Sequence, residues 1–107
     1  MQWETDLRDA AALARNTGRP LLVQVSAEWC THCERMKADT YTDTRIRRLL
    51  SEQFIPVAVD ADDQRKFMQQ MGIRSLPTTL IVAPDLKILE RLQGFQSASS
   101  LLRAVSR

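Results

Sequence analysis

A short apolar run near the start of the chain places the strongest limit on its fold. Residues 21–27 read Leu-Leu-Val-Gln-Val-Ser-Ala, and only Gln24 and Ser26 interrupt the apolar side chains. The run is too short for a buried helix and contains β-branched residues, so it predicts a strand that is buried on both faces. Such strands belong to sheets on which helices pack. We therefore expect an α/β domain in which helices flank a central sheet.

The rest of the chain supplies the elements for such a sandwich. Apolar residues at helical spacing alternate with short apolar runs, and Pro84-Asp85-Leu86 predicts the turn of a hairpin. We expect helices over 5–16, 30–39, from 42 or 43 to about 50, 62–71 and 97–105, and strands over 21–27, 54–60, 78–83 and 87–93. The expected N-caps are Thr5, Thr42 or Asp43, Asp62 or Asp63, and Ser97.

The order of these elements also predicts their pairing. The first two strands are joined by helices and should be parallel, whereas the last two should close as an antiparallel hairpin. Pro56 cannot donate a ladder hydrogen bond, which favours an edge position for the second strand. The expected fold is a three-layer sandwich with a mixed sheet of about four strands.

Composition bounds the domain count and excludes several function classes. A chain of 107 residues that is 44% apolar can close one modest core, so residues 1–107 are expected to form one domain. No apolar stretch approaches the roughly 18 residues of a membrane span, and membrane insertion is not expected. The net charge of +2 comes from 15 basic and 13 acidic residues scattered along the chain, so no nucleic-acid footprint is evident. We expect a monomer.

Function is best argued from two cysteines that two residues separate. Cys30 and Cys33 are the only cysteines, and they begin a predicted helix directly after the buried strand. A helix N-terminus favours an anion, and a thiol whose pKa falls from about 8.5 to about 7 becomes half ionised at neutral pH. Cys30 is therefore the expected nucleophile, and Cys33, one turn later, the more buried resolving thiol.

Two other interpretations of the cysteine pair remain open. A zinc site normally has four ligands, and His32, between the cysteines, is the only other soft ligand, so no metal is expected. A purely structural disulfide would constrain the unfolded chain little, because its loop is very short. Redox chemistry accounts for the pair better than either alternative.

The motif and its context resemble the thioredoxin-like superfamily. The resemblance rests on the run from Leu21 through Trp29-Cys-Thr-His-Cys33, on Leu76-Pro77-Thr78 and on Gly94, and it extends to the C-terminal helix. The helical start and the Tyr41-Thr-Asp-Thr segment are more similar to the small disulfide-reductase and isomerase-like branch than to thioredoxin itself.

This resemblance implies roles for several further residues. Pro77 would follow a cis peptide bond and face the cysteine pair, and Leu76 would offer its backbone to an extended substrate segment. Trp29 and Gly94 would complete the surface on which that segment lies. Trp29 packed in the core and Gly94 as a strand terminator are the simpler alternatives.

The chain departs from the family pattern below the cysteines. The position six residues before the first cysteine, where the family has a buried carboxylate, is Gln24, and the lysine partner of that carboxylate is missing from the matching point near Pro56. Glutamine cannot accept a proton, so resolution by Cys33 should be slower at neutral pH than in a relative that has the carboxylate. Thr31 and His32 should tune the potential, because an imidazolium favours the Cys30 thiolate and makes the disulfide more oxidising.

These features together predict a bacterial thiol–disulfide oxidoreductase. It would act on protein disulfides, receive electrons from a reductase-like or membrane donor, and need no cofactor because the dithiol carries both electrons. The alternative is a peptide-binding or chaperone-like module with a non-catalytic disulfide. The compartment stays open: no export signal is expected at Met1-Gln-Trp3, which favours the cytoplasm for the chain as given, whereas an excised mature domain would belong to the periplasm or cell envelope.

Overall fold

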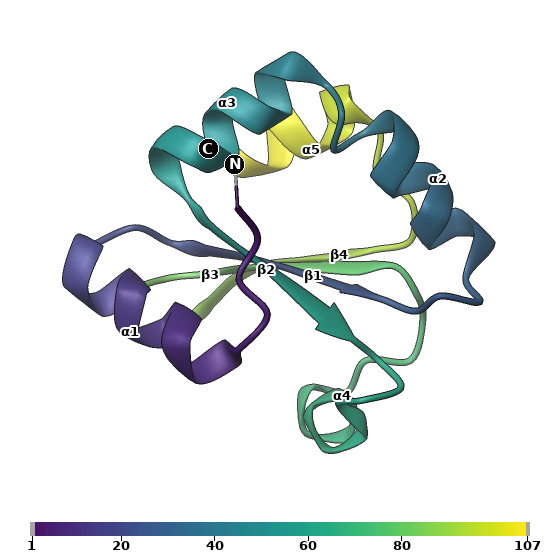
Figure 1. The fold of residues 1–107 in the computed structure, drawn as a ribbon, viewed down its shortest axis with the longest axis horizontal. Coiled ribbons are helices and arrows are strands. Elements are labelled where there is room, and N and C mark those ends of the chain that lie inside the picture. The colour runs from purple at the N-terminus through teal and green to yellow at the C-terminus, as the bar shows by residue number, and fades with distance from the viewer. Residues whose placement is uncertain (1, 107) are drawn as a thin grey trace.

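The computed structural model describes residues 2–106, and these form a four-stranded sheet with helices on both faces (Figure 1). The elements follow the expected order, and their bounds are α1 (Leu7–Thr17), β1 (Leu21–Ser26), α2 (Thr31–Asp39), α3 (Thr44–Gln53), β2 (Ile55–Asp60), α4 (Arg65–Met71), β3 (Thr78–Val82), β4 (Ile88–Gln93) and α5 (Ala98–Val105).

The sheet has the strand order β2-β1-β3-β4, with β1 parallel to β2 and the other neighbours antiparallel. The expected edge position of Pro56 is confirmed, because β2 is the outermost strand on its side. The carbonyl of Pro56 accepts a hydrogen bond of 2.8 Å from the backbone of Glu4, and Ala58 donates one of 2.8 Å to the Glu4 carbonyl. The missing N–H of Pro56 therefore lies on the outer side, where no ladder bond is lost.

Helices cover the two faces of the sheet as the sandwich requires (Figure 1). One face packs against α1 and α4, and the other against α2, α3 and α5. Strands β1 and β3 lie in the middle of the sheet and are buried along nearly their whole length. For β1, the apolar run 21–27 predicted this burial. Alternate residues of β1 divide between the cores, since Val23 and Val25 face α1 whereas Leu22 faces α3.

Two expected helix starts are wrong, and both corrections have a local cause. Helix α1 is capped by Asp6, not Thr5, because the Asp6 carboxylate accepts from the Asp9 N–H at 2.9 Å. Helix α4 follows Gln64, which makes no side-chain cap bond. The expected cap Asp62 instead uses its carboxylate to accept a hydrogen bond from Trp29.

The other two expected caps are confirmed. Asp43 accepts hydrogen bonds from the backbone at the start of α3, and Ser97 accepts one of 3.1 Å from the Ser100 N–H at the start of α5. No helix within residues 2–106 is both long enough and apolar enough to cross a bilayer.

Candidate active site

The cysteine pair lies where β1 passes into α2. Strand β1 ends at Ser26, and a turn closed by the hydrogen bond from the Cys30 N–H to the Ala27 carbonyl, 3.1 Å long, leads into the helix. Cys30 is the N-cap of α2, and Cys33 lies in its first turn. The buried strand thus fixes the helix start at one end of the sheet, where the cysteines meet the loop before β3.

Cys30 and Cys33 form a disulfide, with Cα atoms 5.2 Å apart. The Cys30 sulfur accepts a hydrogen bond of 3.2 Å from the Cys33 N–H, as an N-cap side chain does. The same N–H and the helix dipole would stabilise a thiolate at Cys30 after reduction. Both residues are buried, 6% and 4% exposed, so overall burial distinguishes them little.

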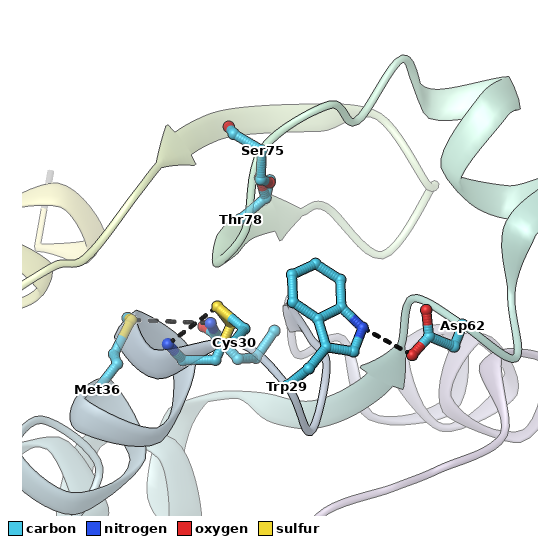
Figure 2. Close-up of a disulfide and its surroundings, with 8 residues drawn as sticks. Trp29, Cys30, Met36, Asp62, Ser75 and Thr78 are labelled. Atoms are coloured by element: carbon cyan, nitrogen blue, oxygen red, sulfur yellow. Dashed lines mark hydrogen bonds between the residues drawn. A yellow bond between two sulfur atoms is a disulfide. The ribbon is translucent and has the colours of Figure 1, made fainter.

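The residues around Cys30 differ sharply in exposure. Trp29 is 69% exposed, and its indole N–H donates a hydrogen bond of 2.9 Å to the Asp62 carboxylate. Figure 2 shows the indole beside Cys30 and directed toward Asp62. Thr31 and His32 are also exposed. The core-packing alternative for Trp29 is therefore wrong.

Leu76 and Pro77 directly precede β3, and Gly94 directly follows β4. The Leu76–Pro77 peptide bond is cis, as the resemblance implied. Pro77 itself is buried, and its carbonyl accepts a hydrogen bond of 2.8 Å from the Gly94 N–H. Gly94 has a φ of 82°, which glycine adopts readily. Leu76 is half-buried and lines an open groove together with Trp29 and Cys30.

Gln24 lies at the centre of a buried polar network below the cysteines. Its side-chain oxygen accepts hydrogen bonds from the Tyr41 hydroxyl and, at 2.7 Å, from the Thr79 hydroxyl, and its amide nitrogen lies 3.7 Å from the Met36 sulfur. Thr79 is the direct cross-strand partner of Gln24. Burial raises the pKa of the Tyr41 phenol above its usual range, so this group remains a proton donor at neutral pH.

The register of the sheet shows which residues of β2 lie next to Gln24 and its neighbours. Gln24 pairs with Ala58 on β2, whereas Pro56 pairs with Leu22. Ala58 therefore lies directly beside Gln24, and neither Ala58 nor Pro56 is basic. The conclusion that this site lacks both the carboxylate and its basic partner is unchanged.

Two hollows meet at the disulfide from different sides. An open groove beside Cys30 is lined by Trp29, Thr31, His32, Ala61, Asp62, Arg65, Met68, Gln69, Ile73, Arg74 and Leu76. A cavity of about 490 Å³ reaches Cys33, and Gln24 and Tyr41 line its inner wall. Its charged residues are Glu28, Glu34, Lys37, Asp60 and Asp63. The two cysteines thus open onto different surroundings.

Sequence reasoning missed several residues that the structure places in the site. Asp62 was expected only as a helix cap, and Thr79 was not expected to take part. A buried glutamine needs hydrogen-bond partners, and the antiparallel register of β1 and β3 could have identified Thr79. Tyr41 and Asp62 come from loops whose path the sequence pattern does not fix. Within residues 2–106 no cluster of three or more His, Cys, Asp or Glu side chains is arranged to hold a metal ion.

Comparison with known proteins places this geometry in a family. A family model described as Thioredoxin-like matches residues 2–84. The chain belongs to the thioredoxin-like family. Solved thioredoxin-like structures share its fold: a thioredoxin from Thermus thermophilus superposes with a TM-score of 0.85 at 24% identity, covering 96% of this chain and 84% of that one.

Curated thioredoxin-like relatives are similar in sequence over most of the chain. The thiol:disulfide interchange protein DsbD of Ralstonia nicotianae is 28% identical over 96% of this chain and 18% of its own length. Protein disulfide-isomerase 2-3 of Arabidopsis thaliana is 31% identical over 80% of this chain and 19% of its own length. The C-terminal domain of Neisseria meningitidis DsbD, in its oxidised form, has a TM-score of 0.74 at 20% identity, with 95% of each chain covered. The chain thus spans about a fifth of these curated relatives.

Proposed function

We propose that this domain is a thiol–disulfide oxidoreductase that exchanges electrons with protein disulfides through Cys30 and Cys33. The observation that carries the proposal is the Cys30–Cys33 disulfide at the start of α2, where a backbone N–H is directed at the Cys30 sulfur. A disulfide held only for stability has no need of this placement. The names of the curated relatives, which refer to disulfide interchange and isomerisation, support the same class of reaction.

The reaction follows from this arrangement in two exchange steps. In the reduced domain, the Cys30 thiolate attacks one sulfur of a substrate disulfide, and the other substrate sulfur leaves as a thiolate that takes up a proton. Cys33 then loses its proton and attacks the Cys30 sulfur of the mixed disulfide. The second substrate thiol is released, and the Cys30–Cys33 disulfide forms. Two electrons pass to the substrate, and an upstream dithiol protein, soluble or membrane-bound, would return them.

Gln24 sets this site apart within the proposed mechanism. An amide in place of a carboxylate cannot accept the Cys33 proton, and the Tyr41 phenol above it is already protonated. The proton would leave through water in the Cys33 cavity or pass to the departing thiolate. Thr31 and His32 are proposed to tune the potential from the exposed first turn of α2. Trp29, Leu76, Pro77 and Gly94 are proposed to bind the substrate segment.

Insulin reduction with dithiothreitol as the electron source tests the proposal. Wild-type protein should accelerate precipitation of the insulin chains, and Cys30→Ser should reduce the rate to that of dithiothreitol alone. Cys33→Ser should accumulate a mixed disulfide at Cys30, visible by mass spectrometry. Retained peptide binding without turnover in the wild type would instead favour the binding module.

A further inference from the structure

The charges around the disulfide are divided between its two sides. The charged side chains of the Cys33 cavity are four carboxylates and one ammonium, those of Glu28, Glu34, Asp60, Asp63 and Lys37. The groove beside Cys30 has the opposite balance, with Arg65 and Arg74 against one carboxylate, Asp62. The nearly neutral total charge conceals this separation.

The single carboxylate of the groove already has a partner. Asp62 accepts the hydrogen bond from the Trp29 indole at 2.9 Å (Figure 2). By contrast, Arg65 and Arg74 form no ion pair and no side-chain hydrogen bond with any residue among 2–106. Both guanidinium groups are exposed and available to a ligand.

Arg65 is also placed where it does not help its own helix. It is the first residue of α4, where the positive end of the helix dipole disfavours a cation. This first turn contains no acidic residue and receives no side-chain cap bond. Local helix stability therefore does not explain an arginine at this position.

The remaining wall of the groove is suited to a polypeptide segment. Trp29, Met68, Ile73 and Leu76 provide apolar surface beside Cys30. A bound segment that presents its disulfide to Cys30 would place the neighbouring side chains between this apolar wall and the two arginines. Guanidinium groups pair with carboxylates in a bidentate geometry that a lone ammonium does not offer.

We infer that this groove selects disulfide partners whose reactive cysteine is flanked by Asp or Glu, and that Arg65 and Arg74 determine this preference. The inference rests on the proposed function, because it concerns the substrate of the same cysteine. The occupant is a protein segment, because a small anion would leave the apolar wall of the groove uncovered.

The test uses three peptides that share one intramolecular disulfide and differ only in the residues flanking the cysteine, which are Glu, Gln or Lys. Second-order rate constants for oxidation of the fully reduced domain are measured in single turnover, by mass spectrometry after acid quench. Because an exposed charge pair contributes up to about 1 kcal/mol, the Glu peptide should react about three- to fivefold faster than the Gln peptide and the Lys peptide more slowly still. The ratio should approach one near 1 M salt, where the Debye length is about 3 Å.

Matched variants assign the effect to the groove. The double variant Arg65→Gln/Arg74→Gln should react with all three peptides at similar rates. Arg8→Gln/Arg103→Gln, which removes the same charge from exposed positions on α1 and α5, should retain the wild-type order. Thermal unfolding of each variant checks that the fold is intact.

Each outcome decides between specific claims. Equal rates for the three peptides in the wild type, or an unchanged preference in the groove variant, would overturn this inference and leave the proposed function standing. If oxidised glutathione reacts faster than the Glu peptide, the preferred substrate is a small anionic disulfide and not a protein segment. That result would overturn the inference. No reaction with any disulfide would overturn the proposed function and the inference together.

Discussion

The two sides of the disulfide differ in how their polar groups are used. At the inner wall of the Cys33 cavity, the Gln24 side-chain oxygen accepts hydrogen bonds from the hydroxyls of Tyr41 and of the buried Thr79. In the Cys30 groove, one polar contact, from Trp29 to Asp62, is internal, and two arginines are unpaired within residues 2–106. Groups that satisfy one another contribute to folding, whereas groups without partners are available to a ligand. Substitutions on the two sides should therefore have different effects.

The largest effect is expected from removing the centre of the buried network. Gln24→Ala leaves the hydroxyls of Tyr41 and Thr79 without their acceptor, and each unsatisfied buried group costs about 1–3 kcal/mol. We expect the free energy of unfolding, from urea titration of the oxidised protein, to fall by about 2–4 kcal/mol. Gln69→Ala, an exposed substitution of the same type in the groove, should change it by less than about 0.5 kcal/mol. Similar losses in both variants would contradict the contrast between the two sides.

The next effect concerns proton transfer from Cys33. Gln24→Asp restores a carboxylate, and positioned general bases accelerate reactions by about 10²-fold or more. We expect release of a trapped mixed disulfide at pH 7 to become at least about tenfold faster. The gain should be smaller than that of a free base, because Tyr41 and Thr79 hydrogen-bond the side chain at this position. The gain should disappear below the pKa of the new carboxyl group. An unchanged rate across the pH profile would show that resolution does not depend on a base at this position.

A smaller effect follows from the raised pKa of Tyr41. Tyr41→Phe removes one hydrogen bond and should lower the free energy of unfolding by about 1 kcal/mol near pH 7. In the unfolded chain the phenol ionises near pH 10, but in the folded protein its pKa is higher. The stability that the phenol contributes is thus complete below pH 10 and is lost as the pH rises further.

The wild-type advantage over Tyr41→Phe should accordingly shrink as the pH rises above about 10. Other groups titrate equally in both proteins and cancel in the difference. Tyr41 is the only tyrosine, so its ionisation can also be followed directly by absorbance. Tyrosinate that appears near pH 10 while the protein is still folded would contradict burial of the hydroxyl.

The smallest effect is expected on the groove side. Asp62→Ala frees the Trp29 indole, and we expect KM for an insulin substrate to rise about two- to threefold, with stability changed by less than about 0.5 kcal/mol. Asp62→Asn keeps an acceptor oxygen and should restore KM. Asp63→Ala removes an equal charge from the neighbouring residue and serves as the control. If Asp62→Ala lowers the free energy of unfolding more than it weakens insulin binding, the Trp29–Asp62 hydrogen bond contributes to folding instead of to substrate binding.

Sequence patterns predicted the fold better than the site because they report on local periodicity and burial. The run 21–27 predicted the fold class, and Pro56 predicted the edge strand. The spacing of Cys30 and Cys33 predicted that the two sulfurs lie together at the start of a helix. Helix starts were less certain, since Thr5 and Asp6 are both good caps and the choice depends on the path of the chain before α1. Asp62 shows the limit most clearly. A tertiary hydrogen bond to Trp29, 33 residues away, outweighs its local preference for a helix cap.

The positions of the charged side chains around the cysteines could not be predicted from the sequence for the same reason. Arg65 begins α4 and Arg74 follows its end, and only the docking of that helix brings them to Cys30. Glu28 and Glu34 flank the cysteines in the sequence but line the opposite hollow. The charged residues nearest the cysteines in the sequence would predict a negative potential beside Cys30, whereas the groove has more arginines than carboxylates.

The hydrogen bonds between Glu4 and β2 also affect how the molecule meets other chains. An open strand edge presents backbone donors and acceptors on which a foreign strand can be added, which leads to aggregation. Here the carbonyl of Pro56 and the N–H of Ala58 are already used by Glu4, and the proline itself offers no donor. Glu4 thus closes this edge of the sheet to strand addition at its centre.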